Sequence, residues 1–185
     1  MSPNRERAAQ LMVEAHEGQV RMGGEPYKVH PFAVEGILLG QGHSETTGIA
    51  GLLHDTVEDT RLTFADLRDE GFDDEVLVPL DYLTKRDDPE FYDDLFAQLT
   101  AEQRRDYVTL RQSGYVSHKH ALSLIRCAYA PHPRARAVKI ADASSNLNDT
   151  LKLIDIAQPD PKHVRQLGKY GLSLTYLTSF PITLT

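Results

Sequence analysis

The apolar residues of this 185-residue chain mostly recur three or four positions apart, which is the spacing of helices that bury one face. The N-terminal stretch shows this spacing at Ala8, Leu11, Met12, Ala15 and Val20. We therefore predict a first helix from Ser2-Pro3 to Gly23-Gly24. Residues 25–30 are expected to be extended, because Pro31 follows and a residue before proline avoids the α conformation.

Caps and breakers divide the rest of the chain into further helices. Pro31 is expected to open a helix that ends near Gly40, and Ser44 is a good N-cap for the next helix. Thr63 and Asp73 are expected to cap two more. Further periodic stretches predict helices over residues 101–112, 117–128, 133–153 and 162–177.

Two stretches do not follow this pattern. Residues 85–99 are polar and acidic and show no clear period. The tail, residues 179–185, has a strand-like composition but no evident partner strand. No internal repeat or low-complexity segment is present, so the pattern as a whole predicts one all-α domain over residues 1–185.

The composition is that of an ordinary globular domain. No apolar run approaches the roughly 18 residues of a membrane span, and the first ten residues lack the apolar core of a secretory signal. Cys127 is the single cysteine, so no disulfide can form within the chain, and we expect it to be a small buried residue. We therefore expect a cytoplasmic protein without a membrane partner.

Charge is distributed unevenly along the chain. The net charge of −7 argues against binding to a nucleic-acid backbone. Residues 66–102 carry 13 acidic and 3 basic residues, or −10, whereas residues 104–139 carry 8 basic and 1 acidic, or +7. Two interpretations stay open: the two segments attract each other, or the basic segment helps to hold a small polyanion.

The stretch GLLHDTVEDT, residues 51–60, carries the most unusual chemistry. If it continues a helix, His54 lies above Glu58 and Asp55 above Asp59, which gathers one imidazole and three carboxylates at the end of an apolar helix. The carboxylates repel one another, and a divalent cation would remove that penalty. Mixed imidazole and carboxylate ligands suit Mn²⁺, Fe²⁺ or Zn²⁺ better than Ca²⁺.

Further ligands must come from elsewhere in the chain. His30 lies at a helix entrance before Pro31, and Asp142 lies in the apolar segment VKIADASSN, where a buried carboxylate needs a partner. Each residue alone has an ordinary structural explanation. Together they form a four-ligand set, which we predict to hold a metal: His30, His54, Asp55 and Asp142.

These residues carry a resemblance to a known family. The order H…HD…D resembles the HD superfamily of metal-dependent phosphohydrolases. HDTVEDT, the block AHEGQVRMGGEPYKVHPFAV and the block VKIADASSNLND resemble a narrower group, the hydrolase domain of the RelA/SpoT homologues and the small alarmone hydrolases. The three blocks cover about a third of the chain, in the family's order.

The resemblance implies a compact single-domain bundle of about ten helices with Mn²⁺ at the four predicted ligands. It implies that Glu58 and Asp59 orient and activate the attacking water, that Arg21 packs on a guanine base, and that Asn146 contacts the nucleotide sugar. The implied reaction removes pyrophosphate from the 3′ position of ppGpp or pppGpp, giving GDP or GTP.

Such a substrate is highly anionic, so the site needs local positive charge. Besides Arg21, we expect Lys28, Lys139 and the bases around Lys119 to supply it. The chain departs from the family pattern over about residues 87–133, where small members have a short segment with a tyrosine-rich helix. We treat this stretch as a divergent inserted segment, and it bears on the substrate more than on the metal.

Alternatives follow from that departure. The same site could remove the 2′-phosphate of NADPH or act on an adenosine alarmone. A catalytically retired domain that binds a nucleotide or a protein partner is a third possibility, although every predicted ligand and the Glu58-Asp59 pair are intact. Homo-oligomers are compatible with the sequence but cannot be predicted from it.

Overall fold

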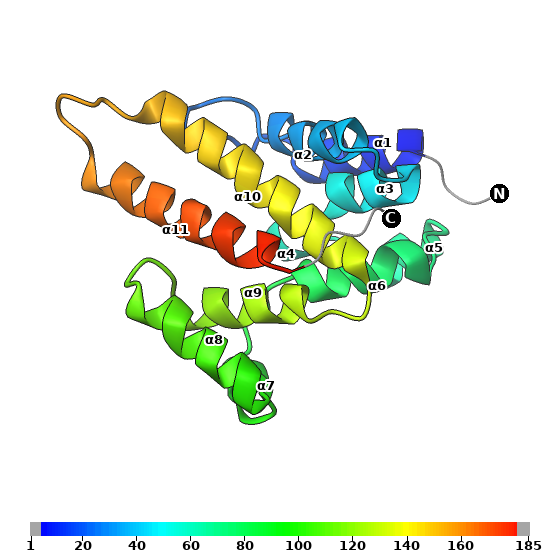
Figure 1. Cartoon of the computed structure of the whole chain (residues 1–185). Coiled ribbons are helices and arrows are strands. Elements are labelled where there is room, and N and C mark those ends of the chain that lie inside the picture. Colours follow the sequence, from blue (N-terminus) through cyan, green and yellow to red (C-terminus); the bar gives the residue numbers. More distant parts are fainter. Residues whose placement is uncertain (1–4, 181–185) are drawn as a thin grey trace.

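The computed structural model describes residues 5–180, and within that range every regular element is a helix (Figure 1). The all-α prediction is therefore confirmed. In chain order the eleven helices are α1 (Arg5–Ala15), α2 (Val29–Gly40), α3 (Glu45–Leu53), α4 (Thr56–Asp59), α5 (Phe64–Asp69), α6 (Asp74–Leu83), α7 (Pro89–Ala97), α8 (Ala101–Gln112), α9 (His118–Ala128), α10 (Pro133–Leu153) and α11 (Pro161–Thr178).

Most helices begin at the predicted caps. The side chains of Ser44, Thr63 and Asp73 each accept a hydrogen bond from a backbone N–H in the first turn of α3, α5 and α6. Helix α7 was not predicted, because its acidic sequence hides the helical period. Its start is nonetheless ordinary: Asp88 is the N-cap and Pro89 the first helical residue.

The N-terminal predictions need two corrections. Helix α1 ends at Ala15 and not at Gly23-Gly24, because Gly18 turns the chain with a φ of 77°. Val20 then leaves the buried stripe and forms an isolated antiparallel bridge with Pro26. His30 is helical and not extended, since Pro31 falls in the first turn of α2, where its missing N–H is not needed.

Helix α10 is the central element. It packs against α2, α3, α6, α9 and α11, and in Figure 1 it crosses the molecule with α11 beside it. The core around it is formed by aliphatic side chains such as Met12, Leu38, Leu52, Leu80 and Leu122, all essentially inaccessible to water. Cys127 is also buried there, as predicted.

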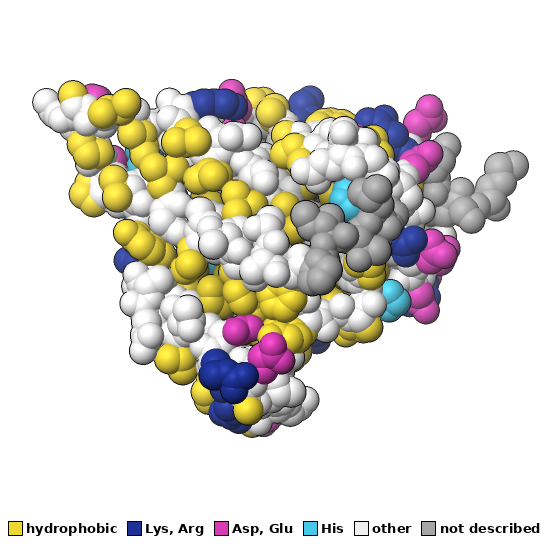
Figure 2. All heavy atoms as spheres, viewed as in Figure 1, with side chains coloured by type: hydrophobic (Ala, Val, Ile, Leu, Met, Phe, Trp, Pro, Cys, Tyr) yellow, Lys and Arg dark blue, Asp and Glu magenta, His cyan; other side chains and the backbone are white. Residues whose placement is uncertain are grey.

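Helices α7 and α8 form a lobe at one end of the molecule and pack mainly on α9 (Figure 1). In the face seen in Figure 2, acidic and basic side chains gather over this lobe, whereas hydrophobic side chains lie along α10 and α11. Ion pairs join the acidic and basic segments at Arg126–Asp81, Lys119–Asp87 and Arg134–Glu75. These contacts support the interpretation that the two segments attract each other.

No helix within residues 5–180 combines the length and the apolar composition needed to cross a membrane. The strand-like tail is described only to Phe180, so the prediction for it falls mostly outside the described residues.

Candidate functional site

The stretch predicted as one continuous helix is broken at its centre. Helix α3 ends at Leu53, His54 and Asp55 form a turn, and α4 begins at Thr56. The His54 ring lies 2.8 Å through Nδ1 from the carbonyl oxygen of Gly51, an acceptor that a continued helix would use for a backbone N–H. The predicted single polar face is therefore wrong: His54 is buried, whereas Asp59 lies at the surface.

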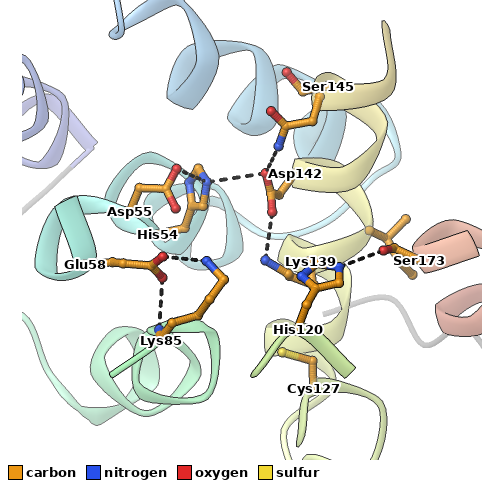
Figure 3. Close-up of polar contacts among 12 residues, drawn as sticks. His54, Asp55, Glu58, Lys85, His120, Cys127, Lys139, Asp142, Ser145 and Ser173 are labelled. Carbon is orange, nitrogen blue, oxygen red and sulfur yellow. Dashed lines mark hydrogen bonds and ion pairs between the residues drawn. The ribbon is translucent and has the colours of Figure 1, made fainter. Parts of the chain in front are cut away.

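The structure brings the four predicted metal ligands together. His54 Nε2 lies 2.9 Å from an Asp55 oxygen and 3.8 Å from an Asp142 oxygen. His30 Nε2 lies 3.3 Å from the same Asp142 oxygen and 3.7 Å from Asp55. The two rings meet edge to face, with centroids 5.1 Å apart. These atoms come from α2, α10 and the α3–α4 turn, so only the folded chain assembles them. Figure 3 shows His54, Asp55 and Asp142 of this cluster.

Both imidazoles keep one nitrogen available. The Nδ1 atoms lie within hydrogen-bonding distance of Ser145 Oγ (3.0 Å from His30) and of the Gly51 carbonyl (2.8 Å from His54). The Nε2 atoms are buried and make no hydrogen bond within residues 5–180. Because a metal-binding imidazole commonly uses its second nitrogen in this way, the residues fit a divalent cation, and His30, His54 and Asp55 lie close enough to hold one.

Asp142 is held by two neighbours on its own helix. Lys139 Nζ donates to Oδ2 at 2.9 Å (Figure 3), and the Asn146 amide donates to Oδ1. Burial alone would raise the pKa of Asp142, but the Lys139 ammonium and the two imidazoles outweigh it and lower the pKa. Asp142 is thus a buried, permanently charged carboxylate.

The ring of His54 is basic in the metal-free cluster. Burial lowers its pKa, but Asp55 and Asp142 more than reverse this and raise the pKa to about 9. Burial likewise raises the pKa of Asp55, and the adjacent His54 brings it well below its usual range. The carboxylates are therefore ready as ligands, whereas His54 must lose a proton before it can bind a metal.

Glu58 and Asp59 have different surroundings. Glu58 accepts hydrogen bonds from the Lys85 ammonium (2.5 Å) and from the Lys85 backbone N–H (2.9 Å), so both its oxygens are engaged. The Tyr27 hydroxyl donates to Asp55 at 2.5 Å and also lies 3.3 Å from an oxygen of Asp59. Burial, with the charges of Asp55 and Glu58, raises the pKa of Asp59. Both oxygens of Glu58 are thus engaged by Lys85, whereas Asp59 has no lysine hydrogen bond within residues 5–180.

Three residues of the cluster, His30, Asp55 and Asp142, line a cavity of about 220 Å³, here called the inner pocket. Its wall combines the acidic residues described above with cations from three other segments, and it includes Lys85, Lys139, Lys169, His120, Tyr170 and Ser173. Lys85 and Lys139 are each paired with one acid of the site, as Figure 3 shows. A dense mixture of carboxylates and ammonium groups of this kind suits a metal together with an anionic ligand.

A second cavity of about 310 Å³, the outer pocket, continues from the inner one and shares Arg21, Tyr27, Asn146 and Tyr170 with it. Arg21 donates to Asn146 (2.9 Å) and Asp149 (3.0 Å), which fixes its guanidinium above the pocket. Apolar side chains such as Met22 and Leu153 complete the wall. This combination of flat cation, amide and apolar surface suits a heterocyclic ring.

One face of α10 runs through both pockets. Lys139, Asp142, Asn146 and Asp149 recur three or four residues apart, so they project from the same side of the helix. The first two line the inner pocket and the last two line the outer pocket.

The charge predictions are only partly matched by this geometry. Lys28 is exposed and lies outside both pockets, and Lys119 bonds the Arg86 carbonyl and pairs with Asp87. Three residues that line the inner pocket were not predicted as site residues: Lys85, Lys169 and Tyr170. Lys169 and Tyr170 lie on the side of α11 that faces α10, but helical periodicity does not tell which neighbour a half-polar face will meet.

Comparison with known proteins places this fold and site in context. The sequence pattern of the HD domain matches residues 8–151. A GTP pyrophosphokinase of Streptomyces coelicolor is 35% identical over 166 residues, which is 90% of this chain but 17% of that protein. A probable GTP pyrophosphokinase of Mycobacterium leprae is 46% identical over 142 residues, 77% of this chain and 15% of that protein.

A third relative is named as a hydrolase and not as a pyrophosphokinase. The guanosine-3′,5′-bis(diphosphate) 3′-pyrophosphohydrolase of Escherichia coli O157:H7 is 41% identical over 85 residues, 46% of this chain and 12% of that protein. The chain thus spans less than a fifth of the length of these relatives.

Among solved structures, that of a metazoan SpoT ortholog, described as hydrolysing ppGpp, superposes with a TM-score of 0.61 over 97% of each chain. At 21% identity this likeness concerns the fold. The HD-domain match over residues 8–151 shows that the chain belongs to the HD domain family, and the bifunctional (p)ppGpp synthase/hydrolase SpoT of Escherichia coli K12, 41% identical over 85 residues, is among its relatives.

Proposed function

We propose that this protein is a metal-dependent 3′-pyrophosphohydrolase of guanosine alarmones, converting ppGpp or pppGpp and water into GDP or GTP and pyrophosphate. The observation that carries the proposal is the buried cluster of His30, His54, Asp55 and Asp142, with two unbonded imidazole nitrogens, at the floor of a pocket rich in ammonium groups. The relative of Escherichia coli O157:H7 is named for this reaction.

His30, His54, Asp55 and Asp142 would hold the metal, which we take to be Mn²⁺. A divalent ion with such ligands polarises a phosphoryl oxygen and acidifies a water molecule. Imidazole together with carboxylate also fits Fe²⁺ and Zn²⁺, so the choice of Mn²⁺ rests on the family resemblance.

Asp59 is the proposed proton acceptor for the attacking water. Its raised pKa makes it a stronger base than an ordinary aspartate, and the Tyr27 hydroxyl fixes its position beside Asp55. Glu58, held on both oxygens by Lys85, orients the water without itself taking a proton. The water oxygen bonds to phosphorus as the bond between phosphorus and the ribose 3′ oxygen breaks, and the proton taken up by Asp59 is passed on to the 3′ oxygen, which leaves as a hydroxyl.

The outer pocket would hold the nucleoside. Arg21 would pack on the guanine ring, and Asn146 would contact the sugar where the two pockets meet. Lys139 would act on the substrate mainly by its positive charge, because its ammonium is hydrogen-bonded to Asp142.

A product assay tests this proposal. Purified protein loaded with Mn²⁺ is incubated with ppGpp, pppGpp, ppApp and NADPH, and the products are separated by ion-exchange chromatography. We expect pyrophosphate and GDP from ppGpp. Free phosphate from NADPH, or pyrophosphate from ppApp alone, would assign the site to one of the alternative substrates. No turnover of any of the four would contradict an enzymatic role.

A further inference from the structure

Lys169 of α11 is the one lysine of the inner pocket without an acidic partner in the described part of the chain. Lys85 and Lys139 also line this pocket, and they are paired with Glu58 and Asp142. Lys169 is half-buried, and its ammonium lies 4.8 Å from the ring centroid of the adjacent Tyr170. Burial, followed by the charges of Lys139 and Lys85, lowers its pKa to about 8. An anion in the pocket would offset the cost of burying this ammonium group and its repulsion from Lys139 and Lys85.

A close contact is made on α11 at Gly168, the residue before Lys169. The ring of Tyr115, from the loop between α8 and α9, lies against Gly168: a Cβ atom at Gly168 would fall 2.2 Å from a carbon of the Tyr115 ring. A glycine inside a helix lowers helix stability by up to about 1 kcal/mol relative to alanine. At position 168 a larger residue would collide with the Tyr115 ring, which explains the glycine. Tyr115 thus touches the residue that precedes Lys169.

Two further bonds tie the same region to α11. His120 Nε2 lies 3.0 Å from Ser173 Oγ in the core (Figure 3), and Asp106 of α8 accepts a hydrogen bond of 2.9 Å from Tyr176. With Tyr115, these contacts bracket the stretch of α11 that lines the pocket. Residues of α8, α9 and the loop between them are therefore attached directly to one wall of the site.

We propose that Lys169 is a substrate-binding residue that holds a phosphate group in the inner pocket, and that Tyr115 is the positioning residue that seats α11 for this task. The inference rests on the proposed function for the identity of the substrate, but phosphate binding itself does not require turnover. A surface lysine would extend into water; Lys169 instead faces two other ammonium groups across a cavity.

The first experiment measures binding of inorganic phosphate to the Mn²⁺-loaded protein by isothermal titration calorimetry. Lys169→Met is expected to weaken binding about tenfold or more, the range for loss of a charge-assisted hydrogen bond. Lys169→Arg should restore much of it. The matched control is Lys162→Met, which removes an exposed lysine from the same helix. Unchanged phosphate affinity in Lys169→Met would overturn the proposal.

The second experiment concerns Tyr115. Tyr115→Ala should weaken phosphate binding by a similar factor, and adding it to Lys169→Met should cause little further loss, because both act through one group. Tyr115→Phe keeps the ring and should behave as wild type, as should Val108→Ala, an exposed control on α8. If the effects of Tyr115→Ala and Lys169→Met add fully, Tyr115 does not act through Lys169. Should Tyr115→Ala fail to fold, Tyr115→Leu takes its place.

These outcomes are separate from the proposed function. If the wild-type protein binds phosphate through Lys169 but hydrolyses no alarmone, the inference holds and the substrate assignment fails. If it hydrolyses ppGpp and Lys169→Met leaves both KM and phosphate affinity unchanged, the inference fails and the function holds.

Discussion

At the scale of single residues, the predicted metal ligands and Glu58 are each oriented by a hydrogen bond to a neighbouring residue. His30 and His54 are oriented through Nδ1, Asp142 through Lys139 and Asn146, and Glu58 through Lys85. The sequence predicted which residues meet, because burying histidine and aspartate in apolar helices costs free energy unless they are paired or bind a metal. It did not predict the Glu58–Lys85 pair, because the two lie 27 residues apart with no shared pattern.

Replacing Asp59 by Asn should lower kcat for ppGpp by about a hundred- to ten-thousandfold, the usual contribution of a general base. Metal binding should be unchanged, because Asp59 lies outside the predicted ligand set. Steady-state kinetics and calorimetric Mn²⁺ titration measure the two effects. Asp69→Asn, at the exposed end of α5, is the matched control. Wild-type kcat in Asp59→Asn would remove Asp59 from the mechanism.

Metal binding should displace about one proton below pH 9, and that proton should come from His54. In the metal-free protein the pKa of His54 is raised to about 9, so the ring is protonated at neutral pH, whereas burial lowers the pKa of His30. Apparent Mn²⁺ affinity should therefore rise about tenfold per pH unit between pH 6.5 and 8.5. Calorimetry in buffers of different ionisation enthalpy counts the protons; a release of none would contradict this account.

At the scale of elements, the spacing of helices decides whether the ligands meet. A Cβ atom at Gly51 of α3 would lie 2.7 Å from a methyl carbon of Leu38 in α2, so the glycine lets these helices approach closely. This approach brings His54, just after α3, to His30 on α2. Caps and glycines made most helices predictable, but the break after α3 depends on a side-chain bond of His54 that no helical period reveals.

Gly51→Ala should destabilise the protein, because overpacking costs about 1–3 kcal/mol and alanine regains no more than about 1 kcal/mol of helix propensity. Gly36→Ala, in α2, should be neutral or stabilising, since a Cβ there meets no atom within 4 Å. Urea unfolding of the metal-free variants compares their free energies of unfolding. Equal stability of the two variants would show that α2 and α3 do not need this glycine.

At the scale of the whole molecule, a few cations help to join the α7–α8 lobe to the other helices. Arg126 of α9 donates to the Asp81 carbonyl and carboxylate, both at 2.6 Å, and lies over the rings of Tyr82 and Phe91. It thus connects α9 to α6 and to α7. The sequence showed the opposite charges of these segments, but not which pair forms, because pairing depends on how the helices pack.

Arg126→Met should lower the free energy of unfolding by about 1.5–3 kcal/mol, because its hydrogen bonds to a charged group lie partly out of water. Arg68→Met should have little effect, since the Arg68–Asp74 pair is mostly exposed. Thermal and urea unfolding measure both. A small effect of Arg126→Met would mean that apolar packing alone attaches the lobe.

The shared face of α10 has a consequence for which molecules the site can accept. From Lys139 to Asp149 the helix rises by about 15 Å, at about 1.5 Å per residue. This helix therefore sets the separation between the residues that line the inner pocket and those that line the outer pocket, so a ligand that occupies both must match that length. One residue inserted between Asp142 and Asn146 would rotate the two ends by about 100° relative to each other. Such an insertion should therefore weaken the binding of any ligand that spans both pockets.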